Sequence, residues 1–458
     1  MQTLVCVKKF IMKDFSSIKK QTITSKILTT TLFVLTLFSC TQNSIENWMV
    51  QIENGEEQTE NLSRYRSYEE ALMIAQEAVE MLEENNATRS GKPRVVSTNS
   101  VQYIVHTSST RSSKGSDTLM YVFNYENDEG FAVISANRET EDLIAVAEQG
   151  HYIVGEDTEN KGFELFMNMA EEYIKTTKED NPIIMANNDG PVDMCELVHI
   201  TRKRLINSYG PFVTTRWGQD APYNQYCVTD TGTVIAAGCL ITAVAQILSY
   251  YEFPTQIAIN YEGGAYTLPL NWSEIKKHMG GYPYTCTCTE HETISLLFRQ
   301  LGYRLGANYW IEDNGGSPHL LNETFRLLGY NQGQLQPYSS SVVQSSLSQG
   351  QLVCISAYSS EGFEGGHAWV IDGYRTLEET KIEYSRNTVT GEMTELWRDI
   401  TRTNRYNHFN WGWDGNYNGY YLCDVFDVQK YNELDFGVSS MGTGSYPYNV
   451  RIFPYITH

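Results

Sequence analysis

A cysteine stands where a glycine-containing loop runs into an apolar segment. After Gly238-Cys239, apolar residues recur at helical spacing until Pro254. We therefore expect Cys239 in the first turn of a helix, where unpaired N–H groups and the positive end of the helix dipole favour a thiolate. The same pattern also fits a buried structural cysteine that packs as a small apolar residue. A partner for the thiol has to decide between a nucleophile and a core residue.

His367 is the histidine whose surroundings best suit such a partner. It follows a glycine-rich stretch that ends at Gly366, and it begins the strand expected at 367–374. A general base has to reach the thiol proton within hydrogen-bonding distance, and Gly366 leaves room for a substrate beside it. Taken alone, a histidine at the start of a strand is more typical of a structural role.

The third polar group is Asn410, in the run Asn410-Trp411-Gly412-Trp413. The chain order Cys239, His367, Asn410 is that of papain-like enzymes, in which the histidine follows the cysteine by roughly 130 residues. Asn410 would accept a hydrogen bond from the imidazole and orient it, while Trp411 and Trp413 shield that bond from water. The aromatic run also fits a packed corner of a sheet, and the two interpretations are compatible.

Four motifs, in this order, closely resemble those of the streptopain family of bacterial cysteine peptidases. They are Trp217-Gly218-Gln219 with Pro222-Tyr223-Asn224, Gly238-Cys239-Leu240 with Ala245-Gln246, Gly366-His367-Ala368-Trp369 through Gly373, and Asn410 through Trp413 with Gly419-Tyr420. The resemblance covers about residues 210–430. It implies a cysteine endopeptidase in which Cys239 is the nucleophile, His367 the general base and then acid, and Asn410 the orienting residue, with protein or peptide substrates and no metal or organic cofactor.

One feature departs from the papain pattern. Papain-like enzymes often place a glutamine of the oxyanion hole a few residues before the nucleophile, but residues 231–237 contain none, and Gln219 and Gln225 lie further upstream. The backbone N–H of Cys239 can supply one donor, and losing the second would cost roughly 10²–10³ in rate. The sequence does not identify that second donor.

The first 40 residues have the pattern of a secretory leader. Lysines recur up to residue 26, and the apolar run 27–38 is too short to span a membrane comfortably. The leader ends Leu37-Phe38-Ser39-Cys40, which resembles a bacterial lipobox whose cysteine receives a lipid. We expect an extracytoplasmic protein, either a cell-envelope lipoprotein anchored through Cys40 or, after cleavage at another small residue, a secreted one.

Three further segments precede the peptidase region. Residues 41–64 are polar and acidic and are expected to be a flexible tether. Residues 65–178 are expected to form a small α+β domain without a catalytic cluster. This domain resembles the prodomain and inhibitor module found with the streptopain family, which implies that it inhibits its own enzyme. Residues 179–209 are expected to be a linker with the processing site, for which Lys203 and Arg204 are candidates.

Residues 210–458 are expected to form the peptidase domain, with helices first and strands second. The predicted fold class is therefore α+β: a papain-like domain with a helical lobe and an antiparallel β lobe, preceded by a small α+β prodomain. The formal net charge of −21 argues against a nucleic-acid partner. The nine cysteines show no legible disulfide framework, and no metal site is expected.

We thus expect a secreted or lipid-anchored cysteine endopeptidase that is made as a zymogen. One alternative is acyl transfer to an amine by a similar Cys-His pair, as in transglutaminase-like proteins. The other is a surface binding protein on a degenerate peptidase scaffold, which the intact Cys239, His367 and Asn410 argue against.

Overall fold

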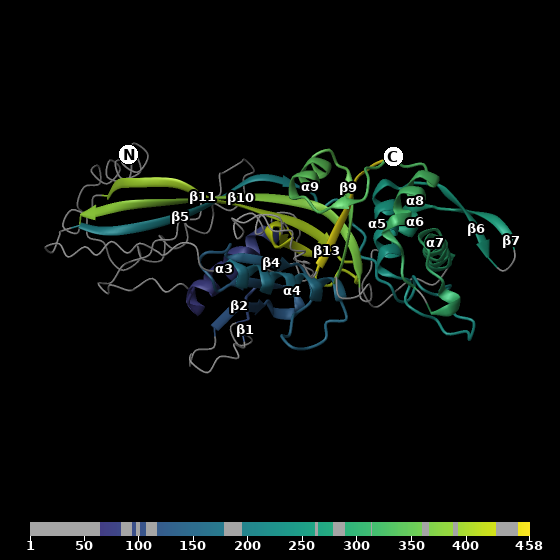
Figure 1. Ribbon diagram of the computed structural model, residues 1–458, viewed down its shortest axis with the longest axis horizontal. Helices are drawn as coiled ribbons and strands as arrows, with labels where there is room; N and C mark the ends of the chain where they lie inside the picture. The colour runs from purple at the N-terminus through teal and green to yellow at the C-terminus, as the bar shows by residue number, and fades with distance from the viewer. Residues whose placement is uncertain are drawn as a thin grey trace, which may run out of the picture. The chain divides into compact units, whose positions relative to one another are not determined.

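The fold is known from a computed structural model (Figure 1). It describes residues 65–83, 94–97, 101–106, 117–177, 195–261, 264–277, 289–312, 314–359, 366–387, 393–426 and 448–458. The predicted leader (1–40), with Cys40, and the predicted tether (41–64) lie outside the described residues, as does most of the predicted linker.

The N-terminal region, residues 65–177, contains two α-helices and four antiparallel strands in its described part. Its elements are α3 (Tyr68–Glu83), β1 (Gln102–His106), β2 (Asp117–Asn124), β3 (Phe131–Ser135), β4 (Leu143–Ala147) and α4 (Lys161–Thr176). The start of α3 has a capping box: Ser67 N–H donates to Glu70 Oε2 over 2.7 Å, and Glu70 N–H donates to Ser67 Oγ over 3.3 Å. Each strand pairs antiparallel with the next.

The helical part of the peptidase region follows. It contains α5 (Cys239–Tyr251), the hairpin β6 (Gln256–Tyr261) and β7 (Gly264–Pro269), α6 (Trp272–Ile275), α7 (Thr289–Leu305), α8 (Leu321–Leu327) and α9 (Ser340–Leu347). Ten residues of α5, from Leu240 to Ser249, are buried. The helix contacts both α7 and the strand β10, so its position in the core is set on both sides.

The strands of the rest of the chain, residues 195–458, lie mainly after these helices. They are β5 (Cys195–Tyr209), β8 (Gln336–Pro337), β9 (Leu352–Ser359), β10 (His367–Asn387), β11 (Met393–Asn410), β12 (Gly419–Leu422) and β13 (Tyr448–Ile456). The predicted α+β class, with its helical part before its antiparallel part, is confirmed. The strand expected at 367–374 extends further as β10, because it pairs along most of its length with β11 and β5.

Among the described residues, eleven strands join in one sheet, in the order β1-β2-β3-β4-β12-β11-β10-β9-β13-β8, with β5 pairing β10. The sheet of the N-terminal region therefore continues into the strands of residues 195–458 through the pairing of β4 with β12. Sequence patterns predicted two separate units and did not reveal this junction.

The segment expected to be a linker is partly sheet. Residues 195–209 form β5, which carries both candidate processing residues, Lys203 and Arg204. The Lys203 ammonium pairs with Asp142 and, at 3.7 Å, with Glu77 of α3. Because a protease needs an extended, accessible chain, this strand is a poor processing site.

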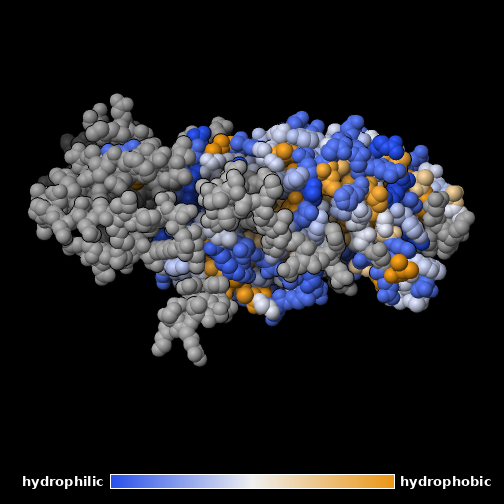
Figure 2. Space-filling view, viewed as in Figure 1, coloured by the Kyte–Doolittle hydropathy of each residue, from blue (hydrophilic) through white to orange (hydrophobic). Residues whose placement is uncertain are grey.

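Apolar side chains are concentrated in the core, and the described surface in Figure 2 is largely hydrophilic with scattered apolar residues. Within the described part of the chain, no helix is both long and apolar enough to span a bilayer.

Candidate active site

Cys239 is the first residue of α5, as predicted. The preceding Gly238 has φ 106°, and a β-carbon there would lie 2.4 Å from the carbonyl oxygen of Asn314. A glycine is therefore required both by the backbone conformation and by the close approach of residue 314. The turn presents the partly exposed Cys239 at the N-terminal end of a buried helix.

His367 is the first residue of β10 and lies against this thiol. The next residue, Ala368, donates its backbone N–H to Cys239 Sγ over 3.3 Å. Burial alone would raise the pKa of Cys239, but the charge of His367, its hydrogen bond to the thiol and the backbone N–H of Ala368 together lower it. The structure thus brings the predicted nucleophile and base together and favours the thiolate.

The second imidazole nitrogen of His367 is held by the backbone. Its Nε2 lies 3.3 Å from the carbonyl oxygen of Trp411. A carbonyl oxygen can only accept, so Nε2 carries the proton in this bond, and Nδ1 is the nitrogen that can exchange a proton with the thiol. The Trp411 indole is fully buried and donates to Tyr417 O over 3.0 Å, which fixes the turn that presents this carbonyl.

Asn410 does not contact the imidazole, in contrast to the prediction. Its Oδ1 accepts from Gln246 Nε2 over 3.0 Å and from Gly412 N–H over 3.3 Å, and its Nδ2 donates to Thr215 O over 2.8 Å. These bonds engage both ends of the side-chain amide. In this structure Asn410 therefore anchors the turn next to Trp411, and the Trp411 carbonyl makes the contact expected of Asn410.

Gln246 links three of the sequence motifs. It is fully buried on α5, two turns after Cys239, and its Oε1 accepts from Trp217 N–H over 3.2 Å while its Nε2 reaches Asn410. One side chain therefore ties the nucleophile helix to the Trp217 segment and to the turn that holds His367. In the sequence, a glutamine on the apolar face of a helix is the feature that could have indicated this role.

The Trp217-Gly218-Gln219 segment lies beside the start of α5. Ala237 N–H donates to Gln219 O over 2.8 Å, and Thr242 Oγ1 donates to Gly218 O over 3.3 Å. Residues shortly before and after Cys239 are thus bonded to this segment. Gln219 is far upstream of Cys239 in sequence but adjacent to Ala237 in space. The residues just before the cysteine therefore do not reveal it as a candidate oxyanion donor.

Trp413 and Gly366, which were predicted to support the site, make fewer specific contacts than Trp411. Trp413 is half-buried and packs against the core, and Gly366 is exposed, with a β-carbon position 3.2 Å from Tyr358 Cβ. Cys227, Cys354 and Cys423 form no disulfide in the described part of the chain, and all three are buried. Burial raises the pKa of Cys227 to about 11 and that of Cys354 further, opposite to the direction at Cys239.

The N-terminal region covers the imidazole. Gly162, in the first turn of α4, approaches so closely that a β-carbon would lie 2.2 Å from His367 Cδ2 and 2.8 Å from Trp411 Cζ3. Next to it, Phe163 stacks on Tyr417 with ring centroids 4.7 Å apart. Only a residue without a side chain fits at this contact.

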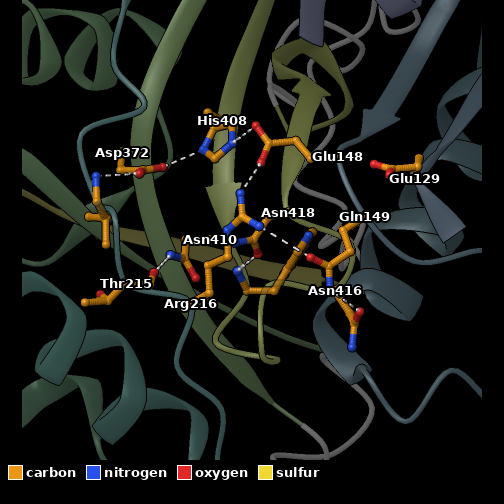
Figure 3. Close-up of polar contacts among 12 residues, drawn as sticks. Glu129, Glu148, Gln149, Thr215, Arg216, Asp372, His408, Asn410, Asn416 and Asn418 are labelled. Carbon is orange, nitrogen blue, oxygen red and sulfur yellow. Dashed lines mark hydrogen bonds and ion pairs between the residues drawn. The ribbon is translucent and has the colours of Figure 1, made fainter. Parts of the chain in front are cut away.

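A second buried histidine lies on the neighbouring strand (Figure 3). His408 Nδ1 is 2.6 Å from Asp372 Oδ1, and its Nε2 is 3.2 Å from Oε1 of Glu148, a residue of the N-terminal region. Burial alone would lower the pKa of His408, but the two carboxylates raise it to about 9. The sequence around His408 gives no signal for this arrangement, because the two carboxylate partners are remote in sequence.

Comparisons with known proteins agree with this arrangement. The pattern of the Peptidase C10 family matches residues 217–421, and that of the Spi protease inhibitor matches residues 59–174. The chain is 23% identical over 367 residues to the thiol protease/hemagglutinin PrtT of Porphyromonas gingivalis, covering 73% of this chain and 36% of that protein. It is 23% identical over 368 residues to streptopain of Streptococcus pyogenes, covering 72% of this chain and 77% of streptopain.

Two solved structures are also similar. A mutant fragment of prointerpain A from Prevotella intermedia is 20% identical, with a TM-score of 0.47 over 78% of this chain and 98% of that fragment. Active interpain A of the same organism is 22% identical, with a TM-score of 0.34 over 54% of this chain and 94% of the other.

These matches define a cysteine protease with an inhibitor-like N-terminal region. The resemblance to the Peptidase C10 family, the streptopain family, covers residues 217–421 of the chain.

Proposed function

We propose that this chain is made as a zymogen and that its peptidase region, residues 210–458, hydrolyses peptide bonds through Cys239. The Cys239 thiolate attacks the substrate carbonyl carbon, and the resulting tetrahedral intermediate collapses when the His367 imidazolium donates its proton to the leaving amine. The neutral imidazole then takes a proton from water, whose oxygen attacks the thioester carbon; the carbon–sulfur bond breaks, the peptide acid leaves, and the thiolate and imidazolium are restored. Each turnover consumes one peptide bond and one water and needs no cofactor.

The observation that carries this proposal is the position of one thiol. Cys239 begins a buried helix, accepts from the N–H of Ala368 and has its pKa lowered chiefly by His367 against the effect of burial. The pKa of Cys227 and that of Cys354, two other described free thiols, are instead raised by burial. A lowered pKa beside a base is what a nucleophilic thiol requires.

Asn410 and Trp411 have complementary roles in the proposal. The carbonyl of Trp411 keeps the Nε2 proton of His367 in place, so that Nδ1 exchanges protons with Cys239. Asn410 acts through Trp411, because its amide is engaged at both ends by Gln246, Gly412 and Thr215. We therefore assign Asn410 as a positioning residue.

We assign the second oxyanion donor to the side chain of Gln219. Its backbone is bonded to Ala237, two residues before the nucleophile, and the residue is 8% exposed. From there an amide N–H can approach the carbonyl oxygen of a substrate bound at Cys239, beside the backbone N–H of the cysteine itself.

The zymogen part of the proposal rests on α4. The backbone of Gly162 lies directly on the edge of the His367 ring, so a substrate cannot occupy that space while the N-terminal region is bound. We propose that residues 65–178 act as the prodomain and that the chain is cut in the segment 179–194, because residues 195–209 belong to the sheet.

We further propose that the protein works outside the cytoplasm. The lysine-rich start, the apolar run 27–38 and the sequence Leu37-Phe38-Ser39-Cys40 support a leader that ends in lipid attachment at Cys40. Mass spectrometry of the mature N-terminus would report the lipid directly. A mature chain that begins at another residue would point to simple secretion.

The central test compares two thiol variants on an unfolded protein substrate. Cys239→Ala should abolish both self-processing and the release of new amino termini. Cys354→Ala, which removes a thiol from the core, should keep both activities. Residual hydrolysis by the Cys239→Ala variant at the wild-type rate would overturn the assignment. Incorporation of an amine probe without new amino termini would instead indicate acyl transfer.

A further inference from the structure

The junction between the two regions combines a strand pair with a buried charge. In the antiparallel pairing of β4 with β12, Ala147 lies opposite Gly419, and Ala145 lies opposite Tyr421. A β-carbon on Gly419 would lie 2.1 Å from Val146 O and 2.7 Å from Ala147 Cα. The edge of β12 thus accepts a closely approaching backbone because its first residue has no side chain.

The pairing continues past β4 into residues with polar side chains. Glu148 N–H donates to Asn418 O over 2.7 Å, and Tyr417 N–H donates to Gln149 O over 3.1 Å. Gln149 also donates through Nε2 to Asn416 Oδ1 over 3.1 Å and accepts from Arg216 Nη1 over 3.4 Å. The register of the incoming segment is therefore fixed by side chains as well as by the ladder.

Glu148 contacts two cationic groups of the peptidase region (Figure 3). Its Oε1 lies 3.2 Å from His408 Nε2, and its Oε2 lies 3.6 Å from Arg216 Nη2, while its side chain is only 7% exposed. Burial alone would raise the pKa of Glu148, but the hydrogen bond from His408 and the charges of His408 and Arg216 lower it. The carboxylate is consequently bound as an anion inside the junction.

Asp372 holds the His408 imidazolium on the side away from Glu148. Asp372 has no exposed side-chain surface; its Oδ1 pairs with His408, and its Oδ2 accepts from Val213 N–H over 2.9 Å. His408 therefore donates from both nitrogens, to a carboxylate of its own region and to one of the N-terminal region. Without Glu148, the protonated imidazole would keep one carboxylate and lose the other.

From these contacts we propose that β12, Arg216 and His408 form a docking site that recognises an extended strand followed by a carboxylate, and that it retains residues 143–149 after the chain has been cut. Release of the N-terminal region, rather than the cut itself, then exposes His367. The proposal rests on the proposed zymogen function, because it names the contact that regulates the same site. Its occupant is the chain's own segment Leu143 to Gln149.

The test separates binding from catalysis. In the full chain carrying Cys239→Ala, a recognition sequence for a site-specific protease is placed between residues 178 and 194, the chain is cut, and dissociation of the N-terminal fragment is followed on the immobilised peptidase region. We expect the fragment to remain bound after cutting, and Glu148→Gln to speed its dissociation by at least about 30-fold, as expected for loss of a buried charge partner.

Two further variants keep the result interpretable. Glu164→Gln makes the same chemical change on an exposed helix position, where Glu164 pairs with Lys161, and should leave the dissociation rate unchanged. Arg216→Gln alters the opposite side of the contact and should speed dissociation by a smaller factor, even if Glu148→Gln does not fold. Immediate loss of the wild-type fragment on cutting, or equal rates for Glu148→Gln and wild type, would overturn the proposal.

The same measurement distinguishes this proposal from the proposed function. Slow, Glu148-dependent release from a chain whose wild-type form hydrolyses nothing would reject the peptidase mechanism and keep the docking site. Rapid, Glu148-independent release from an active enzyme would reject the docking site and keep the peptidase mechanism.

Discussion

Two buried histidines lie on the paired strands β10 and β11 and have opposite surroundings. His367 faces a thiol on one side and the carbonyl oxygen of Trp411 on the other. His408 lies between the carboxylates of Asp372 and Glu148. Two carboxylates fix both ring nitrogens as donors and keep the proton, whereas one neutral carbonyl fixes a single nitrogen and leaves the other able to exchange.

This difference explains why His367 is the proposed base and His408 is not. Both rings are buried and both contact the N-terminal region, through Gly162 at His367 and through Glu148 at His408. Burial and contact with that region therefore do not distinguish them. The charge of the partners does, and each of the following predictions alters one partner or one ring.

Replacing the two rings separately in the processed enzyme gives the largest expected contrast. His367→Gln removes the general base and should lower kcat/KM by about 10³-fold. His408→Gln should cost far less, because in the processed enzyme that ring keeps Asp372 as its partner and does not contact the thiol. Steady-state hydrolysis of a peptide substrate measures both, with unfolding curves to show that the variants are folded. Equal losses of kcat/KM in the two variants would contradict the proposed difference between the two histidines.

The pH dependence of stability tests the proton on His408. Its pKa is raised to about 9, so the stabilisation is fully present below the ordinary histidine pKa and is lost as pH rises through about 9. For the uncut Cys239→Ala chain, the free energy of unfolding should fall by on the order of 3 kcal/mol between about pH 6.5 and pH 10. Chemical denaturation of this chain with and without His408→Gln measures the effect. An identical pH profile for the two would contradict it.

Gln246 tests whether the Trp411 carbonyl is held in place from the nucleophile helix. Gln246→Leu leaves Trp217 N–H and Asn410 Oδ1 without this partner and should lower kcat by about 10²-fold, with a smaller change in KM, because the base is misplaced. Ser249→Ala is the matched control: Ser249 lies on the same helix as Gln246, and its hydroxyl is hydrogen-bonded to Thr215 Oγ1 and to the Gln246 carbonyl oxygen. Similar kinetics for the two variants at equal stability would show that Gln246 is merely structural.

A substitution at Gly162 tests whether α4 covers His367, and its expected effect on reactivity is the smallest of the four. Gly162→Ala forces α4 away from the ring and should make Cys239 in the uncut chain react several-fold faster with a thiol probe. Lys161→Ala, one residue earlier on the exposed side, should leave the rate unchanged. No acceleration in Gly162→Ala would mean that α4 does not limit access.

Local patterns in the sequence predicted the elements that carry the site. The start of α5 at Cys239 and the start of β10 at His367 follow from spacing and turn residues within a short window. The fold class followed from the order of such elements. A sequence pattern carries no signal for a hydrogen bond made by a main-chain carbonyl. The sequence therefore predicted that Asn410 holds the His367 imidazole, whereas in the structure the Trp411 carbonyl does.

The junction of the two regions was hidden for a different reason. The strands β4 and β12 are far apart in sequence, and neither carries a motif that names its partner. Glu148 resembles any acidic residue after a strand until His408 and Arg216 are brought to it by folding. Gln219 is similar, because only the loop geometry brings it beside Ala237.

The most direct test of the central claim is the rate of thiol alkylation against pH in the processed enzyme, with the labelled residue mapped by mass spectrometry. We expect Cys239 to react first, with a midpoint pH below the ordinary pKa of a thiol, and we expect His367→Gln to move this midpoint upward. A midpoint unaffected by His367→Gln, or labelling that favours Cys227, Cys354 or Cys423, would contradict it.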